Sequence, residues 1–179
     1  MKIAISQLNY IIGDIDGNTA KILDAISKAK AENADLIIFS ELAVCGYPPK
    51  DLLDYPNFID RCESAVKLIG ENSNDIGLII GAPSWSNLER GKKLYNSAFF
   101  YENKKMLKRI GKKLFATYDL FDEYRYFESN KIFECVPFRG EKLAITICED
   151  LWNIDDEKMY KVIPMDELKK EDPSLMINL

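Results

Sequence analysis

The 179-residue sequence contains no histidine. Hydrolases that activate a serine or cysteine through an imidazole need that side chain, so Ser-His-Asp and Cys-His catalysis are both excluded. The commonest metal ligand is missing as well, and the cysteines, at positions 45, 62, 135 and 148, form no CxxC pair. We therefore expect no zinc or other metal site, and reduced thiols in a reducing compartment.

The sequence also lacks long hydrophobic runs and a positive charge balance. No apolar stretch approaches the ~18 residues of a membrane-spanning helix, and the first residues show no signal-peptide pattern. Acidic residues exceed basic ones, 29 to 24, which gives no electrostatic reason to expect nucleic acid as a partner. Since there is no repeat or linker, we expect one cytoplasmic domain over residues 1–179 that binds neither nucleic acid nor membrane.

Apolar segments with strand and helix periodicity alternate along the chain. Helices are predicted from a turn at residues 14–18 to about residue 33, and over residues 58–69. Strands are predicted at residues 3–8, 34–39, 76–82, 94–102, 106–115, 132–136 and 142–147. Residues 103–105 predict a hairpin turn, and 138–141 a second connection. Residues 175–179 resemble a buried strand that ends as it begins, which predicts either a piece of a longer protein or a short final strand.

Three reactive side chains follow directly after predicted strands. Glu41 follows the run at 36–40, Lys112 follows 106–111, and Cys148 follows 143–147. Open α/β folds place their sites outside the carboxyl ends of strands. A carboxylate base, an ammonium for an oxyanion and a thiol nucleophile form a complete set for acyl transfer without imidazole.

Each of these residues also has an ordinary structural explanation. A free cysteine often fills a small apolar space, and a glutamate at a strand end is usually solvated. Lys112 lies in a basic run that is typical of the exposed face of a hairpin. Strand alternation places Lys112 and Lys113 on opposite faces, so only one of them can point inward. A non-catalytic interaction module is therefore an alternative to an enzyme.

The other cysteines are expected to be inert. Cys62 lies on the apolar face of a predicted helix, and Cys135 in a predicted strand, whereas Cys45 lies in a loop that can expose it. A cationic neighbour lowers a thiol pKa from ~8.5 toward neutrality, so we expect Lys112 to lower the pKa of Cys148.

Together the segments 38–42, 112–115 and 147–150 resemble the nitrilase (carbon–nitrogen hydrolase) superfamily, whose triad is Glu-Lys-Cys. Within it, residues 46–53, 117–127 and 148–152 are most similar to the amino-terminal glutaminase domain of the glutamine-dependent NAD synthetase family. The family usually has Leu-Pro where this sequence has Phe115-Ala116. The resemblance covers nearly the whole chain but only part of the family's length.

The resemblance implies an α/β fold, a four-layer α-β-β-α sandwich that is incomplete at its C-terminus. It implies that Cys148 attacks the side-chain amide of L-glutamine, that Glu41 carries the proton and that Lys112 holds the oxyanion. A free-standing amidase or nitrilase with the same triad is the enzymatic alternative.

The resemblance also implies a ligand pocket and partners. Tyr118 and Glu149 would contact glutamine, and Tyr47 and Glu123 would line the pocket. The aromatic and acidic segment 117–127 would then be a wall over a small polar ligand, in which Glu123 supports the lysine or the base; a surface loop is the plainer alternative. No cofactor is implied for this chain. ATP and Mg²⁺ would be used by its own synthetase domain, and a homo-oligomer is expected.

Overall fold

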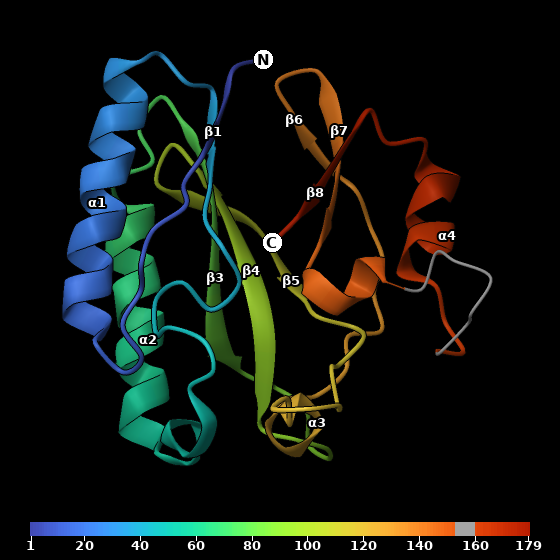
Figure 1. Cartoon of the computed structure of the whole chain (residues 1–179). Helices are drawn as coiled ribbons and strands as arrows, with labels where there is room; N and C mark the ends of the chain where they lie inside the picture. The colour runs from blue at the N-terminus through green and yellow to red at the C-terminus, as the bar shows by residue number, and fades with distance from the viewer. Residues whose placement is uncertain (153–159) are drawn as a thin grey trace.

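The computed structural model describes residues 1–152 and 160–179, and its elements form four layers. Two β-sheets lie face to face, with α1 (Ile15–Ala31) and α2 (Pro56–Gly70) outside the larger sheet (Figure 1). The short helix α4 (Pro164–Leu168) lies outside the smaller sheet. The predicted α/β fold with α-β-β-α layers is therefore confirmed.

The larger sheet has the strand order β1-β2-β3-β4-β5. Its first three strands, β1 (Ile3–Ile5), β2 (Leu36–Ile38) and β3 (Gly77–Trp85), are parallel. The next two, β4 (Leu94–Glu102) and β5 (Lys105–Gly111), are antiparallel to their neighbours. β1 and β2 are shorter than predicted, and the chain turns away from the sheet after β2, at residues 41–45. The carboxyl end of β2 thereby delivers Glu41.

Tight turns set the lengths of the later strands. Asn103 and Lys104 have positive φ, as do Arg139 and Gly140, which is the geometry of two-residue hairpins. The strand predicted at 132–136 is observed later in the chain, as β6 (Val136–Phe138) directly before the second turn. It pairs with β7 (Glu141–Thr146). β8 (Leu175–Asn178) then pairs with β7 in parallel. The strand predicted at 106–115 ends at Gly111, and Lys112 lies in the segment that follows.

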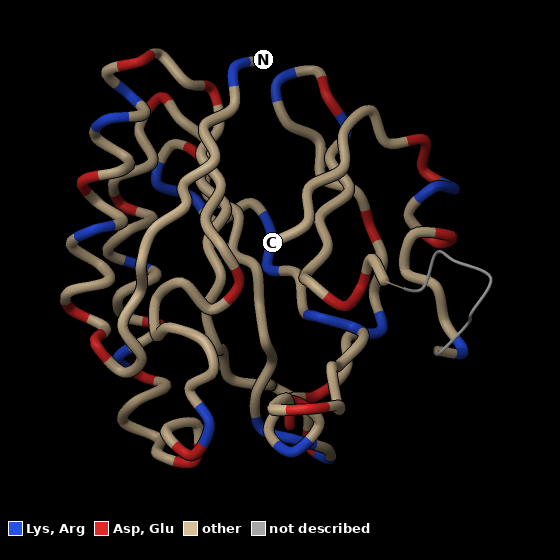
Figure 2. The backbone as a smooth tube through the Cα atoms, viewed as in Figure 1, with Lys and Arg blue, Asp and Glu red and all other residues tan. Residues whose placement is uncertain are grey.

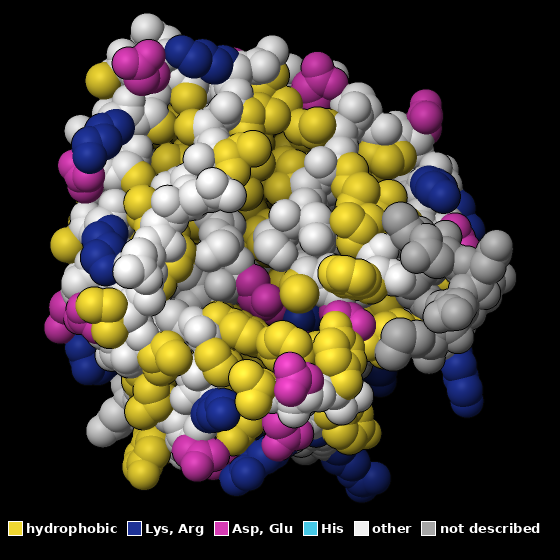
Figure 3. Space-filling model, viewed as in Figure 1, with side chains coloured by type: hydrophobic (Ala, Val, Ile, Leu, Met, Phe, Trp, Pro, Cys, Tyr) yellow, Lys and Arg dark blue, Asp and Glu magenta, His cyan; other side chains and the backbone are white. Residues whose placement is uncertain are grey.

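The core consists of apolar layers between these elements. One cluster fills the space between α1, α2 and the larger sheet, and a second joins the two sheets through residues such as Phe100 and Phe138. The rings of these two residues meet edge to face with centroids 5.2 Å apart. Charged positions of both signs alternate along α1 and α2 (Figure 2), while hydrophobic side chains gather between the two halves (Figure 3).

Four acidic or basic side chains break this pattern within the described residues, because they are buried: Lys112, Glu123, Glu149 and Asp150. They belong to the segments after β5 and β7, together with α3 (Glu123–Tyr126) and η2 (Cys148–Leu151). No helix in the described part of the chain is long and apolar enough to cross a membrane. Burying a charge is costly unless it is paired, so these residues mark where the fold is not optimised for stability alone.

Candidate active site

Lys112 is the centre of a buried cluster of polar groups. Its side chain is fully buried, and its Nζ lies 2.7 Å from Glu41 Oε1 and 2.7 and 2.9 Å from the two oxygens of Glu123. Asn96 adds a neutral donor, since its Nδ2 lies 2.7 Å from Glu41 Oε1 and 3.3 Å from Glu123 Oε1. The structure therefore brings two of the three predicted catalytic residues into direct contact.

Glu41 reaches this cluster because a glycine lets its turn lie against the sheet. A Cβ at Gly81 of β3 would lie 2.4 Å from Leu42 N and 2.5 Å from Ser40 O, both of which are backbone atoms. The turn itself is tied to β3 by a 3.2 Å hydrogen bond from Val44 N to Gly81 O. Close approach of two backbones requires a residue without a side chain, so Gly81 determines the position of Glu41.

Lys112 points inward and Lys113 does not, as strand alternation predicts. The Lys112 backbone continues the sheet by one hydrogen bond, from its N–H to Asn96 O at 2.8 Å. Lys113 is half-buried, and its backbone N–H is bound by Asp150 Oδ1 at 2.9 Å. The basic run is thus divided between the interior and the surface, and the solvated-face alternative does not hold for Lys112.

Cys148 lies at a sharp turn between β7 and η2. Its φ is +43°, a left-handed conformation that is uncommon outside glycine, asparagine and aspartate. Asp150 holds the turn: Oδ2 accepts from Ile147 N at 3.2 Å, while Oδ1 accepts from Lys113 N and Leu114 N. One buried carboxylate thereby ties the segment of the cysteine to the segment of Lys112.

The pKa of Cys148 is raised to about 11, and the sequence-based expectation of a lowered value is wrong. Burial is the largest cause, and the negative charge of Glu41 adds to it. Lys112 acts in the opposite direction but is outweighed, because Glu123 and Glu149 also lie near the thiol. The resting cysteine is therefore a neutral thiol, and it needs a base to become a nucleophile.

The neighbouring carboxylates keep Lys112 protonated. Burial alone would lower the pKa of Lys112, but Glu41 and Glu123 outweigh it and raise the pKa above its ordinary value. Burial raises the pKa of Glu123 to about 7, although Lys112 opposes this effect. Two carboxylates beside one ammonium leave a net negative charge, so the cluster can accept a proton near neutral pH.

Glu149 forms a second polar group beside the cysteine. Its side chain is 2% exposed, and its two oxygens lie 3.1 Å from the Tyr118 hydroxyl and 2.6 Å from the Tyr160 hydroxyl. Both partners are neutral. Tyr118 is also exposed at 45%, so it borders solvent while holding Glu149 in place. The predicted ligand contacts Tyr118 and Glu149 thus lie together, and Glu149 directly follows Cys148 in the chain.

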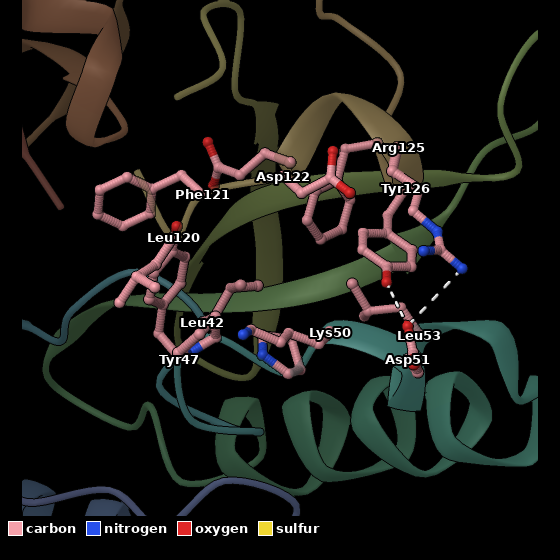
Figure 4. A pocket seen from close by; sticks show the side chains of 14 residues that line it. Leu42, Tyr47, Lys50, Asp51, Leu53, Leu120, Phe121, Asp122, Arg125 and Tyr126 are labelled. Atoms are coloured by element: carbon pink, nitrogen blue, oxygen red, sulfur yellow. Dashed lines mark hydrogen bonds and ion pairs between the residues drawn. The ribbon is translucent and has the colours of Figure 1, made fainter. Parts of the chain in front are cut away.

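A cavity of about 190 Å³ lies beside the cluster, between the 42–53 and 120–127 segments. Figure 4 shows Tyr47, Leu120 and Phe121 on one side and Arg125 with Tyr126 on the other, the last two joined to Asp51. Tyr47 and Glu123 are among its lining residues, whereas Glu41, Lys112 and Cys148 are not. Glu123 has both oxygens engaged by Lys112, so it supports the lysine directly.

Comparison with known proteins gives the family of this chain. Residues 2–158 match the model of the carbon–nitrogen hydrolase family. The chain belongs to the carbon–nitrogen hydrolase family. It is 40% identical over 184 residues to the glutamine-dependent NAD(+) synthetase of Synechocystis sp., covering 99% of this chain and 33% of that protein. It is 34% identical to the Aquifex aeolicus protein of the same name over 157 residues, covering 87% of this chain and 27% of that one.

Solved structures of two kinds share the fold. The glutamine-dependent NAD+ synthetase of Acinetobacter baumannii, determined with ADP, superposes with a TM-score of 0.87 at 33% identity, covering 99% of this chain and 31% of that one. An amidase from Nesterenkonia sp. superposes with a TM-score of 0.71 at 22% identity, over 84% of this chain and 56% of that one, which shows the fold alone. This carbon–nitrogen hydrolase chain thus spans about a third of the length of the first of these relatives.

The remaining cysteines of this carbon–nitrogen hydrolase are packed differently from one another. Cys62 is fully buried on α2, as predicted. Cys45 is also fully buried, so the expectation that its loop could expose it is wrong. The reason is that the 41–45 turn packs inward against β3. Cys135 is half-buried and lies outside any strand, before β6 begins.

Sequence reasoning missed three residues at this site. Asn96 gave no signal, because a single asparagine in an apolar strand has no recognisable pattern. Asp150 was visible only as part of a matching motif, without a role. Tyr160 lies 11 residues after Glu149, and nothing in the sequence connects the two. Asn96 and Tyr160 contact predicted site residues, and Asp150 binds the backbone of their chain neighbours Lys113 and Ile147.

Proposed function

We propose that this chain hydrolyses the side-chain amide of L-glutamine and releases ammonia, with Cys148 as nucleophile, Glu41 as general base and Lys112 as oxyanion donor. The observation that carries the proposal is the 2.7 Å contact between Lys112 Nζ and Glu41 Oε1 beside a cysteine held at a left-handed turn. Family membership supports carbon–nitrogen bond hydrolysis, and the relatives' names supply glutamine.

The first step transfers the thiol proton. Because the pKa of Cys148 is raised to about 11, the thiol stays protonated at neutral pH and Glu41 has to remove its proton as the sulfur attacks the amide carbon. The C–S bond forms while the carbonyl oxygen becomes an oxyanion. Glu41 then returns the proton to the departing nitrogen, the C–N bond breaks, and ammonia and a thioester result. Water, activated by Glu41, releases glutamate and restores the thiol.

Lys112 is suited to stabilise the oxyanion. Its raised pKa keeps the ammonium charged throughout the reaction, and burial strengthens its attraction for a developing negative charge. The two carboxylates that hold it fix its direction. Glu123 acts here as a support of Lys112, and Tyr47 as part of the pocket wall.

Glutamine selectivity follows from the charge of Glu149, to which no cation of the described residues donates a hydrogen bond. Its hydrogen-bonding side chains, Tyr118 and Tyr160, are neutral tyrosines. A buried carboxylate with neutral partners favours a cationic ligand group. The α-ammonium of glutamine is such a group, whereas a simple aliphatic amide has none.

The wider reaction extends the proposal to a synthetase unit. The relatives that this chain matches are named glutamine-dependent NAD(+) synthetases, and they are about three times its length. Ammonia would pass to a synthetase domain that uses ATP and Mg²⁺ to amidate deamido-NAD, in a cytoplasmic homo-oligomer. Among residues 1–152 and 160–179, no group of three His, Cys, Asp or Glu side chains is placed to hold a metal ion.

Covalent labelling of the full-length gene product tests the proposal. A diazoketone analogue of glutamine should modify Cys148 before Cys45, Cys62 or Cys135, and free glutamine should protect it. Cys148→Ser should abolish both labelling and ammonia release, while Cys135→Ser, the half-buried control, should leave both unchanged.

Two outcomes would contradict the proposal. Preferential labelling at another cysteine would remove Cys148 as nucleophile. Equal hydrolysis of glutamine and of a short aliphatic amide would leave the catalytic role intact but would favour the free-standing amidase alternative over a glutaminase.

A further inference from the structure

Asn96 occupies an unusual place in the polar cluster. It lies near the start of β4 and is fully buried, yet its side chain hydrogen-bonds to charged groups. Its Nδ2 donates to Glu41 Oε1 at 2.7 Å and reaches Glu123 Oε1 at 3.3 Å. Its backbone oxygen accepts the N–H of Lys112 at 2.8 Å. A single residue therefore contacts all three charged members of the cluster.

The other end of the same amide is unsatisfied. Asn96 Oδ1 is buried and has no hydrogen-bond partner among the described residues. A buried acceptor without a partner costs free energy, and most native structures avoid it. Reversing the amide would give Oδ1 no better position, because it would then face two carboxylates. The orphaned oxygen is the consequence of directing both N–H donors toward the acidic groups.

The number of donors on Lys112 shows why a neutral donor is needed. An ammonium has three N–H groups. Lys112 Nζ lies within 2.9 Å of three oxygens, one from Glu41 and two from Glu123, so its donors are fully used in the resting state. To bind an oxyanion, Lys112 has to redirect one of them. Glu41 then keeps a fixed position only if another donor holds it.

We propose that Asn96 is a positioning residue that holds Oε1 of Glu41 in place while Lys112 turns toward the oxyanion, so that Glu41 Oε2 faces the thiol. Among the described residues, every hydrogen bond to the Glu41 carboxylate goes to Oε1, from Asn96 and from Lys112. Oε2 is left as the atom that takes the proton from Cys148 Sγ. This inference rests on the proposed function, in which Glu41 is the base.

Asn96 should also affect the pH dependence. The groups that face the two carboxylates are Lys112 after β5, Cys148 of η2 and Tyr47 of the pocket wall, and the only cation among these is Lys112. Hydrogen bonds to an ionised carboxylate lower its pKa. Without the Asn96 donor the pKa of Glu123, which burial already raises to about 7, would rise further, and the acidic limb of the pH–rate profile would move upward.

The test compares Asn96→Ala and Asn96→Asp with Ser97→Ala in the full-length gene product. Ser97 is the neighbouring buried polar residue of β4, and its hydroxyl lies 2.8 Å from that of Ser84, away from the cluster. Asn96→Asp keeps the volume but replaces the donor by a third carboxylate, and it covers the case in which Asn96→Ala fails to fold. Circular dichroism confirms the fold, and glutamine hydrolysis gives kcat and KM across pH.

We expect both Asn96 variants to lower kcat by on the order of 10- to 100-fold, the scale of a misplaced catalytic group, with KM for glutamine little changed. The acidic limb should shift to higher pH in Asn96→Ala, and Ser97→Ala should match the wild type in both respects. A folded Asn96 variant with wild-type kcat and an unshifted limb would overturn the role of Asn96 alone. A wild-type protein that neither hydrolyses glutamine nor reacts at Cys148 would overturn the proposed function and this role with it.

Discussion

Lys112 Nζ lies 2.7 Å from Glu41 Oε1, although 71 positions separate the two residues in the sequence. The contact is buried, with the lysine side chain fully inaccessible and the glutamate 12% exposed. A buried ion pair often contributes little net stability, because desolvation offsets the attraction. Its presence at the ends of two strands, beside a strained cysteine, is better explained by a catalytic role than by a contribution to stability.

Replacing Glu41 by Gln should abolish turnover while the fold is largely retained. The amide keeps the size of the side chain and can still accept from Lys112, but it cannot take the proton of a thiol. General base catalysis is worth ~10²–10⁴-fold, so ammonia release from glutamine should fall by about that factor. Near wild-type hydrolysis by a folded Glu41→Gln variant would place the base elsewhere.

Lys112→Ala and Lys113→Ala should differ sharply. Loss of an oxyanion donor costs about 10²–10³-fold in kcat, so Lys112→Ala should lose at least ~10²-fold. Lys113→Ala should be nearly neutral, because the half-buried Lys113 contributes its backbone N–H, not its side chain, to the contact with Asp150. Glutamine hydrolysis of the two purified variants, side by side, measures this. Equal losses of kcat in the two variants would show that the inward direction of the Lys112 side chain does not contribute to catalysis.

The sequence predicted those features of the site that depend on strand ends. Glu41, Lys112 and Cys148 each follow a predicted strand, and this local pattern is enough to group them. The opposite directions of Lys112 and Lys113 followed from strand alternation. Order along the chain and apolar patterning thus determine which segments meet.

Features that depend on the sum of distant groups were not predictable. A single neighbouring cation predicts a lowered pKa for Cys148, but burial and the surrounding carboxylates raise it. Cys45 was expected to be accessible because its loop contains prolines, yet the close contact at Gly81 turns that segment inward. Asn96 escaped notice because its role comes from three tertiary contacts and from no local motif.

Stability should depend on pH through Glu123. Its folded pKa is raised to about 7 from an ordinary 4.5, mainly by burial, so the folded state binds more protons than the unfolded state between these values. The free energy of unfolding should therefore contain a contribution that decreases as pH rises through this window. Glu123→Gln removes the titration, and denaturant unfolding at a series of pH values should show a smaller decrease in that variant. An unchanged slope would mean that Glu123 does not titrate in this range.

Gly81→Ala should reduce activity through the position of Glu41. The added Cβ would lie 2.4 to 2.8 Å from backbone atoms of residues 40–42, which cannot move away as a flexible side chain would. Overpacking costs ~1–3 kcal/mol of stability. The backbone would relieve the clash by shifting the turn that carries Glu41. Gly77→Ala on the same strand is the matched control, since its Cβ would meet the side chains of Phe138 and Leu36, away from Glu41. Both variants should be destabilised in denaturant unfolding. At a temperature where both are folded, only Gly81→Ala should have a lower kcat for glutamine. The reason is that only this substitution displaces the Glu41 carboxylate from Lys112.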